Sequence, residues 1–211
     1  MRAILLLSLI LSTPLVSQAQ DGAADFERGS FKLKNSSVVQ EGLMRLGNKN
    51  LVVKQLFDGP NTKYPWADVS SYCLGLQKFI RASGFVIKSP SGWSYQPAEE
   101  EFVELLDSGT VSLLRYKQFH ANQQGGSYEV LYLLKRADES KATAIPFSVL
   151  DGAGKKFREF LEPYVTGRPD LLALLRDKKI TIYNLQTFIH ASNHREPFLH
   201  YPMQELLPSS K

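Results

Sequence analysis

The chain has 211 residues, a formal net charge of +4 and a single cysteine. The small positive excess is spread along the chain, which does not indicate a nucleic-acid partner. Because Cys73 is alone, we expect no internal disulfide and a fold stabilised by burial of apolar side chains.

Residues 1–19 have the layout of a secretory signal peptide. Arg2 precedes an apolar run over residues 3–11, and Ser17 and Ala19 place small side chains at the −3 and −1 positions of a cleavage site. The apolar run is about half of the roughly 20 residues that a membrane-spanning helix needs. We therefore expect cleavage near Ala19 and a mature chain without a transmembrane segment, located in the periplasm or outside the cell. Export also disfavours ATP-dependent chemistry, because ATP is a cytoplasmic resource.

Residues 20–150 are predicted to form a strand-rich domain. Phe31 and Leu33 alternate with Lys32 and Lys34, which is the period of a half-buried strand. Short turn clusters of Gly, Asn, Ser and Pro separate further β-prone segments, at residues 38–46, 51–57, 77–80 and 85–88. Strands joined in this way favour an antiparallel meander.

Two segments of this domain are less regular. Pro65 disfavours a central strand, so we expect a loop or a short helical turn over residues 64–69. Residues 102–106 and 110–116 are predicted to form a hairpin around Asp107-Ser108-Gly109, although Glu99–Glu101 after Pro97 would also suit the first turn of a helix. A hydrophilic loop over residues 121–126 is expected before a strand over residues 128–134.

After Pro146 the hydrophobic period changes to that of helices. One helical face collects Phe157, Phe160, Leu161 and Tyr164. Pro169 suits the first position of a second helix, and Thr181 suits the cap of a third, whose apolar face would carry Ile182, Leu185, Phe188 and Ile189. We expect a helical unit over residues 151–196, packed on the strand-rich domain or adjacent to it, and a mobile tail over residues 197–211. The predicted fold class is mainly β (α+β), an antiparallel strand-rich body followed by a small C-terminal helical unit.

Six segments together carry a resemblance to other proteins. They are residues 25–33, 64–69, 107–116, 128–135, 156–161 and 168–172. In this order they resemble a group of uncharacterised exported proteins common in Bacteroidota. The usual layout of that group is a signal peptide, a strand-rich body and two or three C-terminal helices. The resemblance implies the same architecture and an envelope or extracellular location. The group has no established activity, so the resemblance implies no catalytic residues.

The sequence matches neither a phosphate-binding loop nor the nucleophile motif of α/β hydrolases. Gly152-Ala153-Gly154-Lys155 is similar to part of a phosphate-binding loop, but Val149 and Lys156 stand where that loop needs Gly and Ser or Thr. A flexible turn entering a helix is the favoured interpretation. The chain also lacks the Gly-x-Ser-x-Gly elbow of α/β hydrolases.

His190 and His194 stand one helical turn apart, a spacing that can hold zinc. The zinc-protease motif needs Glu directly after the first His, and Ala191 is there instead. Glu196 and His200 would be further ligands. The favoured interpretation is a polar helix end, where His suits the C-terminal dipole, so we expect no bound cofactor and keep a metal site as the weaker alternative.

Four aromatic residues lie in connections rather than in regular strands, namely Tyr64, Trp66, Trp93 and Tyr95. On exposed loops they would stack on sugar rings or anchor a partner protein. The alternative, which we favour, is that they close the ends of a β core.

These features lead to two hypotheses about function. The first is an exported, non-enzymatic binding or structural module for a protein, glycan or lipid-like ligand. The second is a hydrolase acting on an envelope or environmental polymer. A hydrolase needs a cleft where carboxylates, His or a metal converge, whereas a binding module needs an exposed aromatic or apolar patch or an open groove.

Overall fold

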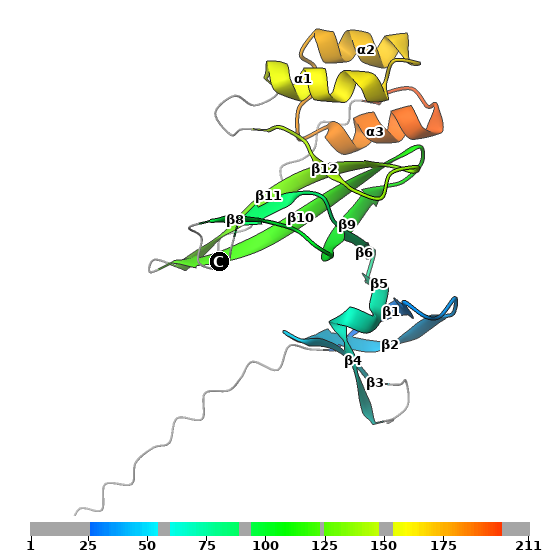
Figure 1. Cartoon of the computed structure of the whole chain (residues 1–211). Helices are drawn as coiled ribbons and strands as arrows, with labels where there is room; N and C mark the ends of the chain where they lie inside the picture. The colour runs from blue at the N-terminus through cyan, green and yellow to red at the C-terminus, as the bar shows by residue number, and fades with distance from the viewer. Residues whose placement is uncertain (1–25, 55–59, 89–93, 123–124, 148–153, 200–211) are drawn as a thin grey trace, which may run out of the picture.

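A computed structural model describes residues 26–54, 60–88, 94–122, 125–147 and 154–199. The predicted signal peptide, Trp93 and His200 lie outside these residues. The described chain is mainly β and antiparallel, with three short helices at its C-terminal end, so the predicted fold class is confirmed (Figure 1). Cys73 is a free cysteine. No helix in the described part of the chain is long and apolar enough to cross a membrane.

The main sheet has ten antiparallel strands in the order β12-β11-β10-β9-β6-β5-β1-β2-β3-β4. Its strands, in chain order, are β1 Glu27–Leu33, β2 Val39–Leu46, β3 Asn50–Lys54, β4 Asn61–Pro65, β5 Val69–Leu74, β6 Gln77–Ala82, β9 Glu101–Asp107, β10 Val111–Asn122, β11 Gly125–Arg136 and β12 Thr143–Ala144. A second sheet pairs β7, Val86–Lys88, with β8, Tyr95–Pro97. Consecutive strands pair along most of the sheet, as expected for a meander, and the predicted hairpin of residues 102–116 is formed by β9 and β10.

The helices cover one face of the sheet at its β9–β12 end (Figure 1). They are α1 Lys155–Leu161, α2 Pro169–Arg176 and α3 Leu185–His194, with short 3-10 turns at Trp66–Asp68 and Glu162–Tyr164. Their buried side chains include Phe157, Leu161, Leu171, Leu175 and Phe188, which pack on Val111, Leu113 and Leu134 of the sheet.

Strands β10 and β11 are buried on both faces where they cross the centre of this region. Leu113 and Leu134 belong to the core under the helices, whereas their neighbours Leu114 and Leu133 belong to a second core with Phe85. Successive side chains of a strand point to opposite faces, so a Leu-Leu pair fills both cores at once. A third core, around Phe31, Met44 and Leu51, stabilises the β1–β5 end of the sheet.

Three local predictions differ from the structure. The loop or short helical turn predicted over residues 64–69 is only partly formed: Trp66–Asp68 is a 3-10 turn, whereas Tyr64 and Pro65 end strand β4. Strand β4 is the outer strand of the described sheet, so no further described strand needs the missing N–H of Pro65. The predicted loop over residues 121–126 is instead the end of a long hairpin, which pairs in unbroken register as far as Asn122 and Gly125. Helix α3 begins at Leu185, because Asn184 accepts a hydrogen bond from Thr181 N and donates one to Lys179 O, which folds the preceding residues into a turn.

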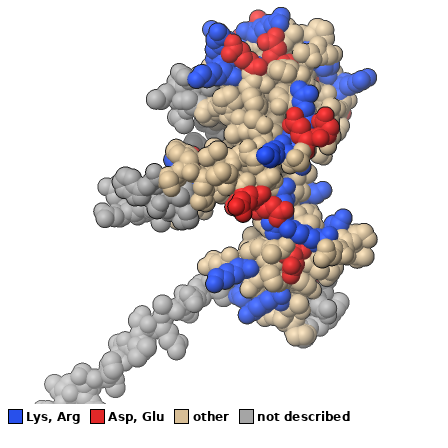
Figure 2. All heavy atoms as spheres, in the orientation of Figure 1, with Lys and Arg blue, Asp and Glu red and all other residues tan. Residues whose placement is uncertain are grey.

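The charges are distributed over the surface. On the face shown in Figure 2, acidic and basic side chains occur over the helical end and over the β1–β4 end of the molecule. Several of them form ion pairs between neighbouring strands, such as Arg115 of β10 with Glu104 of β9 at 2.6 Å.

Leu171 and Leu76 provide a matched test of the helical core. Leu171→Ala should lower the free energy of unfolding by about 2–5 kcal/mol, because it removes a fully buried side chain and leaves a cavity. Leu76→Ala should change it by less than about 0.5 kcal/mol, because Leu76 is fully exposed at the turn between β5 and β6. Denaturant unfolding measures both, and equal effects would contradict the helical packing.

Candidate functional site

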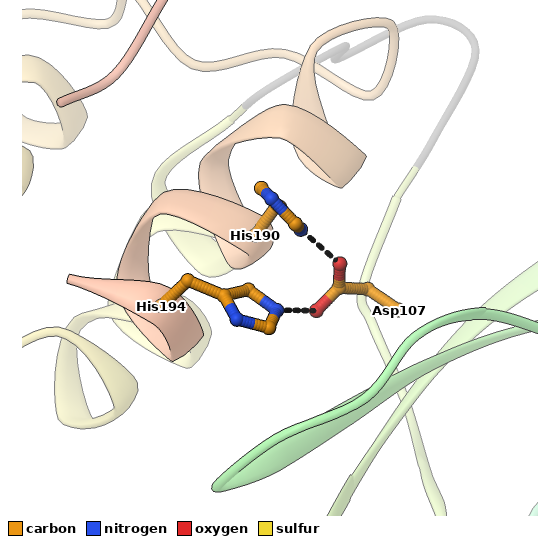
Figure 3. Close-up of side chains that lie close together, drawn as sticks. All are labelled: Asp107, His190 and His194. Carbon is orange, nitrogen blue, oxygen red and sulfur yellow. Dashed lines mark hydrogen bonds and ion pairs between the residues drawn. The ribbon is translucent and has the colours of Figure 1, made fainter. Parts of the chain in front are cut away.

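Two histidines and an aspartate meet where α3 lies against the end of β9. His190 and His194 are four residues apart on α3, so both rings project from one face, and their centroids are 4.2 Å apart. Figure 3 shows both rings directed at the carboxylate of Asp107, the last residue of β9. We call these three residues the Asp-His-His cluster.

The two carboxylate oxygens of Asp107 face different rings. Oδ2 lies 2.6 Å from Nδ1 of His190, and Oδ1 lies 3.9 Å from Nε2 of His194. The Asp107 side chain is only 8 % exposed, whereas the His190 and His194 side chains are 47 % and 43 % exposed. The cluster therefore has a shielded carboxylate at its base and two imidazoles that solvent reaches.

Asn193 fixes the position of the carboxylate. Its Nδ2 donates to Asp107 Oδ1 at 2.6 Å and to Val111 O at 2.8 Å, and its Oδ1 accepts from Val111 N at 3.1 Å. A Cβ on Gly109, in the turn between β9 and β10, would lie 2.6 Å from Cγ of Asn193. The absence of a side chain at Gly109 thus lets α3 approach the β9–β10 hairpin closely enough to form the cluster.

A hollow of about 370 Å³ opens beside the cluster. Its lining includes Asp107, His190, Arg115, Gln186 and Tyr183. On the far side of His190, Nε2 lies 3.7 Å from a carboxylate oxygen of Glu196. The cluster is thus accessible from a concave surface and has a second carboxylate close to it.

A larger groove, of about 790 Å³, adjoins this hollow through Tyr132, Ile182 and Tyr183. Its lining includes six consecutive residues of β11, 127–132, together with residues 181–183 and Phe147. Tyr183 is 73 % exposed and Tyr128 is 68 % exposed. The groove therefore presents aromatic rings to solvent.

The groove follows the edge of β11 on the side away from β10. On the side away from β10, the described residues pair with β11 through β12 only at Leu133 and Leu134, and Ile145 N donates to Tyr132 O at 2.8 Å. Alternate residues of an antiparallel strand direct their N–H and C=O groups to the same side. The main-chain groups of Tyr128 and Val130 therefore face this side as Tyr132 does, and no described strand pairs with them there.

Three ionisable side chains lie together in the groove. Glu129 forms an ion pair with Lys88 at 3.1 Å and lies 3.2 Å from Nε2 of His120. The hydrogen bond and charge of Glu129 raise the pKa of Lys88 above its usual value. Lys88 accordingly stays protonated at neutral pH, and the Glu129 carboxylate is already paired.

The structure places the predicted aromatic residues in different environments. Tyr64 and Trp66 are half-buried and pack on the core of the β1–β5 end, where Trp66 Nε1 donates to Gly47 O at 2.8 Å. Trp66 also contacts the rings of Tyr72 and Phe102. Tyr95 lies in β8 and is 68 % exposed. These three residues do not gather into one site, and their predicted role in ligand binding stays a prediction.

Two members of the Asp-His-His cluster are recognisable in the sequence, and the third is not. The four-residue spacing of His190 and His194 is visible in the sequence, but Asp107 is 83 residues from His190 along the chain. Its position in an Asp-Ser-Gly turn signals a hairpin rather than a ligand. The groove is not recognisable in the sequence either, because its lining comes from two segments that are far apart in the chain, β11 and the residues before α3.

Asn193→Ala should lower the free energy of unfolding by about 1–3 kcal/mol, because it leaves the buried main-chain groups of Val111 without their partner. Gln186→Ala is the matched control, since it removes an exposed amide of the same helix that donates to Leu106 O. Water can replace that bond, so the expected change is below about 0.5 kcal/mol. Thermal or urea unfolding tests both, and an Asn193→Ala protein as stable as the control would refute this role.

Comparison with known proteins adds no relative. No protein-family model matches the chain, and no significant match was found among the curated proteins or among the solved structures.

Proposed function

We propose that this protein is an exported, non-enzymatic binding module whose groove receives an extended segment of a partner protein. The observation that carries the proposal is the course of the groove along the edge of β11, where no described strand pairs with Tyr128 and Val130. An open edge of this kind offers donors and acceptors at the spacing of another β-strand.

The side chains of the groove suit the same ligand. Main-chain hydrogen bonds along a sheet edge give affinity, and pockets for alternate side chains give specificity. Tyr128, Tyr183 and Phe147 supply large, exposed contact surfaces in the groove. Tyrosines are among the residues that contribute most to protein interfaces, because the ring is buried while the hydroxyl keeps a polar partner.

The pairing of charges in the groove favours binding over hydrolysis. The Glu129 carboxylate is neutralised by Lys88 and contacts His120. In the sheet next to the smaller hollow, Arg115 donates to Glu104 through two nitrogens, at 2.9 and 2.6 Å. A general acid or base has to exchange protons with a substrate, and carboxylates held in such pairs are poorly placed to do so.

The proposed location rests on the sequence. The signal-peptide layout of residues 1–19 and the resemblance to exported proteins of Bacteroidota both support export to the envelope or beyond it. The single free cysteine is compatible with an oxidising compartment, since it requires no disulfide partner.

A peptide library tests the binding function. Dodecapeptides displayed on phage and selected on the wild-type protein should yield binders, and Tyr183→Ala should weaken their binding about tenfold or more. Val130→Pro should do the same, because proline lacks the N–H that would bond an added strand. Val130→Ala keeps that N–H and is the matched control for the side chain.

The test needs a control for folding, and two results would contradict the proposal. Proline is tolerated on an edge strand, so Val130→Pro should keep the wild-type circular dichroism. If the variant does not fold, the main-chain hydrogen bonds can be tested from the side of the ligand. Selected peptides that are N-methylated at alternate positions lack those N–H groups and should bind the wild-type protein more weakly. Selected peptides that bind all variants equally, or glycans that bind in a Tyr183-dependent way, would overturn the proposal.

Export is tested on native material. Intact-mass analysis and N-terminal sequencing should show a mature chain beginning at or near Gln20, because Ser17 and Ala19 define the cleavage site. A version with Ala19→Arg should keep its leader, since signal peptidase requires a small residue at that position. Native protein that retains Met1 and stays in the cytosol would contradict export.

A further inference from the structure

We propose that Asp107, His190 and His194, none of which lines the peptide groove, form a binding site for one zinc ion, independent of the function proposed for the groove. The ligand atoms of the three side chains all lie within 4.8 Å of one another. Two imidazoles and one carboxylate are a ligand set that zinc uses in proteins.

The distances in the cluster fit a tetrahedral ion after small side-chain rotations. With zinc–ligand bonds of about 2.0–2.2 Å, neighbouring ligand atoms of a tetrahedral site are about 3.3 Å apart. The two contacts of Asp107, 2.6 Å from Oδ2 to His190 Nδ1 and 3.9 Å from Oδ1 to His194 Nε2, lie on either side of that value. Both rings are directed at the carboxylate, so the ion would lie between the three groups (Figure 3).

One neighbouring residue already orients the carboxylate ligand, since Asn193 donates to Asp107 Oδ1 at 2.6 Å. Glu196 lies 3.7 Å from Nε2 of His190, the ring nitrogen that would not bind the metal, and this is beyond hydrogen-bond distance. A rotation of the exposed Glu196 side chain would bring its carboxylate onto that nitrogen, where carboxylates orient the ligating histidines of many zinc sites.

The site would leave one coordination position to solvent. Three protein ligands plus one open position is the arrangement of zinc sites that bind water or an exogenous ligand, whereas structural zinc sites have four protein ligands. The exposed side of His190 lines the hollow of about 370 Å³, so a small ligand can reach this position.

The hydrogen bonds of the cluster would also form without a metal, so the test has to separate a metal site from a simple contact between helix and sheet. Zinc chloride titrated into the metal-free full chain at pH 7.5 should give one bound ion per chain, with a dissociation constant on the order of 1 µM or tighter. Isothermal titration calorimetry measures the affinity, and elemental analysis after dialysis measures the stoichiometry.

Asp107→Asn and His194→Ala should each weaken zinc binding at least about tenfold. Asp107→Asn keeps the size of the side chain and can still accept a hydrogen bond from Asn193, so the fold should be retained. Asp138→Asn removes an exposed carboxylate outside the cluster and should leave the affinity unchanged. Zinc should also raise the unfolding temperature of the wild type and not that of His194→Ala, because the ion joins α3 to β9.

Absence of zinc binding in the micromolar range would overturn the proposal. Binding that is equal in the wild type, Asp107→Asn and His194→Ala would also overturn it, since the ion would then be held elsewhere. Neither result bears on the peptide test, because none of the three proposed zinc ligands lines the peptide groove.

Discussion

Burial of both faces of β10 and β11 is the constraint on which the rest of this structure depends. Leu113 and Leu134 lie under the helices, while Leu114 and Leu133 lie in the opposite core. A sheet region that is apolar on both sides needs cover on both sides. The C-terminal helices supply one cover, and their packing sets the position of α3 above the end of β9. The groove and the Asp-His-His cluster both arise at the border of this covered region.

The groove lies along the part of β11 that extends beyond its pairing with β12. Strand β12 has two residues, so it pairs with only the end of a twelve-residue strand. Open edges are usually blocked by charges, bulges or proline, because they invite pairing with another chain. Here the groove along the edge combines the exposed rings of Tyr128 and Tyr183 with the ion pair of Glu129 and Lys88. Aromatic side chains next to main-chain groups with which no described strand pairs are suited to the proposed partner strand.

The residue that supports the Asp-His-His cluster also stabilises the contact between helix and sheet. Asn193 connects α3 to the β9–β10 hairpin through Val111 and also orients Asp107. This connection fixes the carboxylate below two histidines that are spaced by one helical turn. A polar contact that is held rigidly on two elements is a favourable support for a metal ion, because ligands need little rearrangement on binding. Stability and zinc affinity are therefore expected to be linked at Asn193.

The sequence by itself determined the fold class and the type of most elements. Alternation at Phe31 and Leu33, turn residues between strands and the helical spacing of Phe157 and Leu161 are local patterns, and local patterns specify local structure. They also marked His190 and His194 as a pair. The tertiary structure alone decided where these elements meet. Asp107 reaches the histidines, and residues 181–183 come to line the groove along β11, through contacts between segments that are far apart in the chain. Such contacts leave no periodic signal in a single sequence.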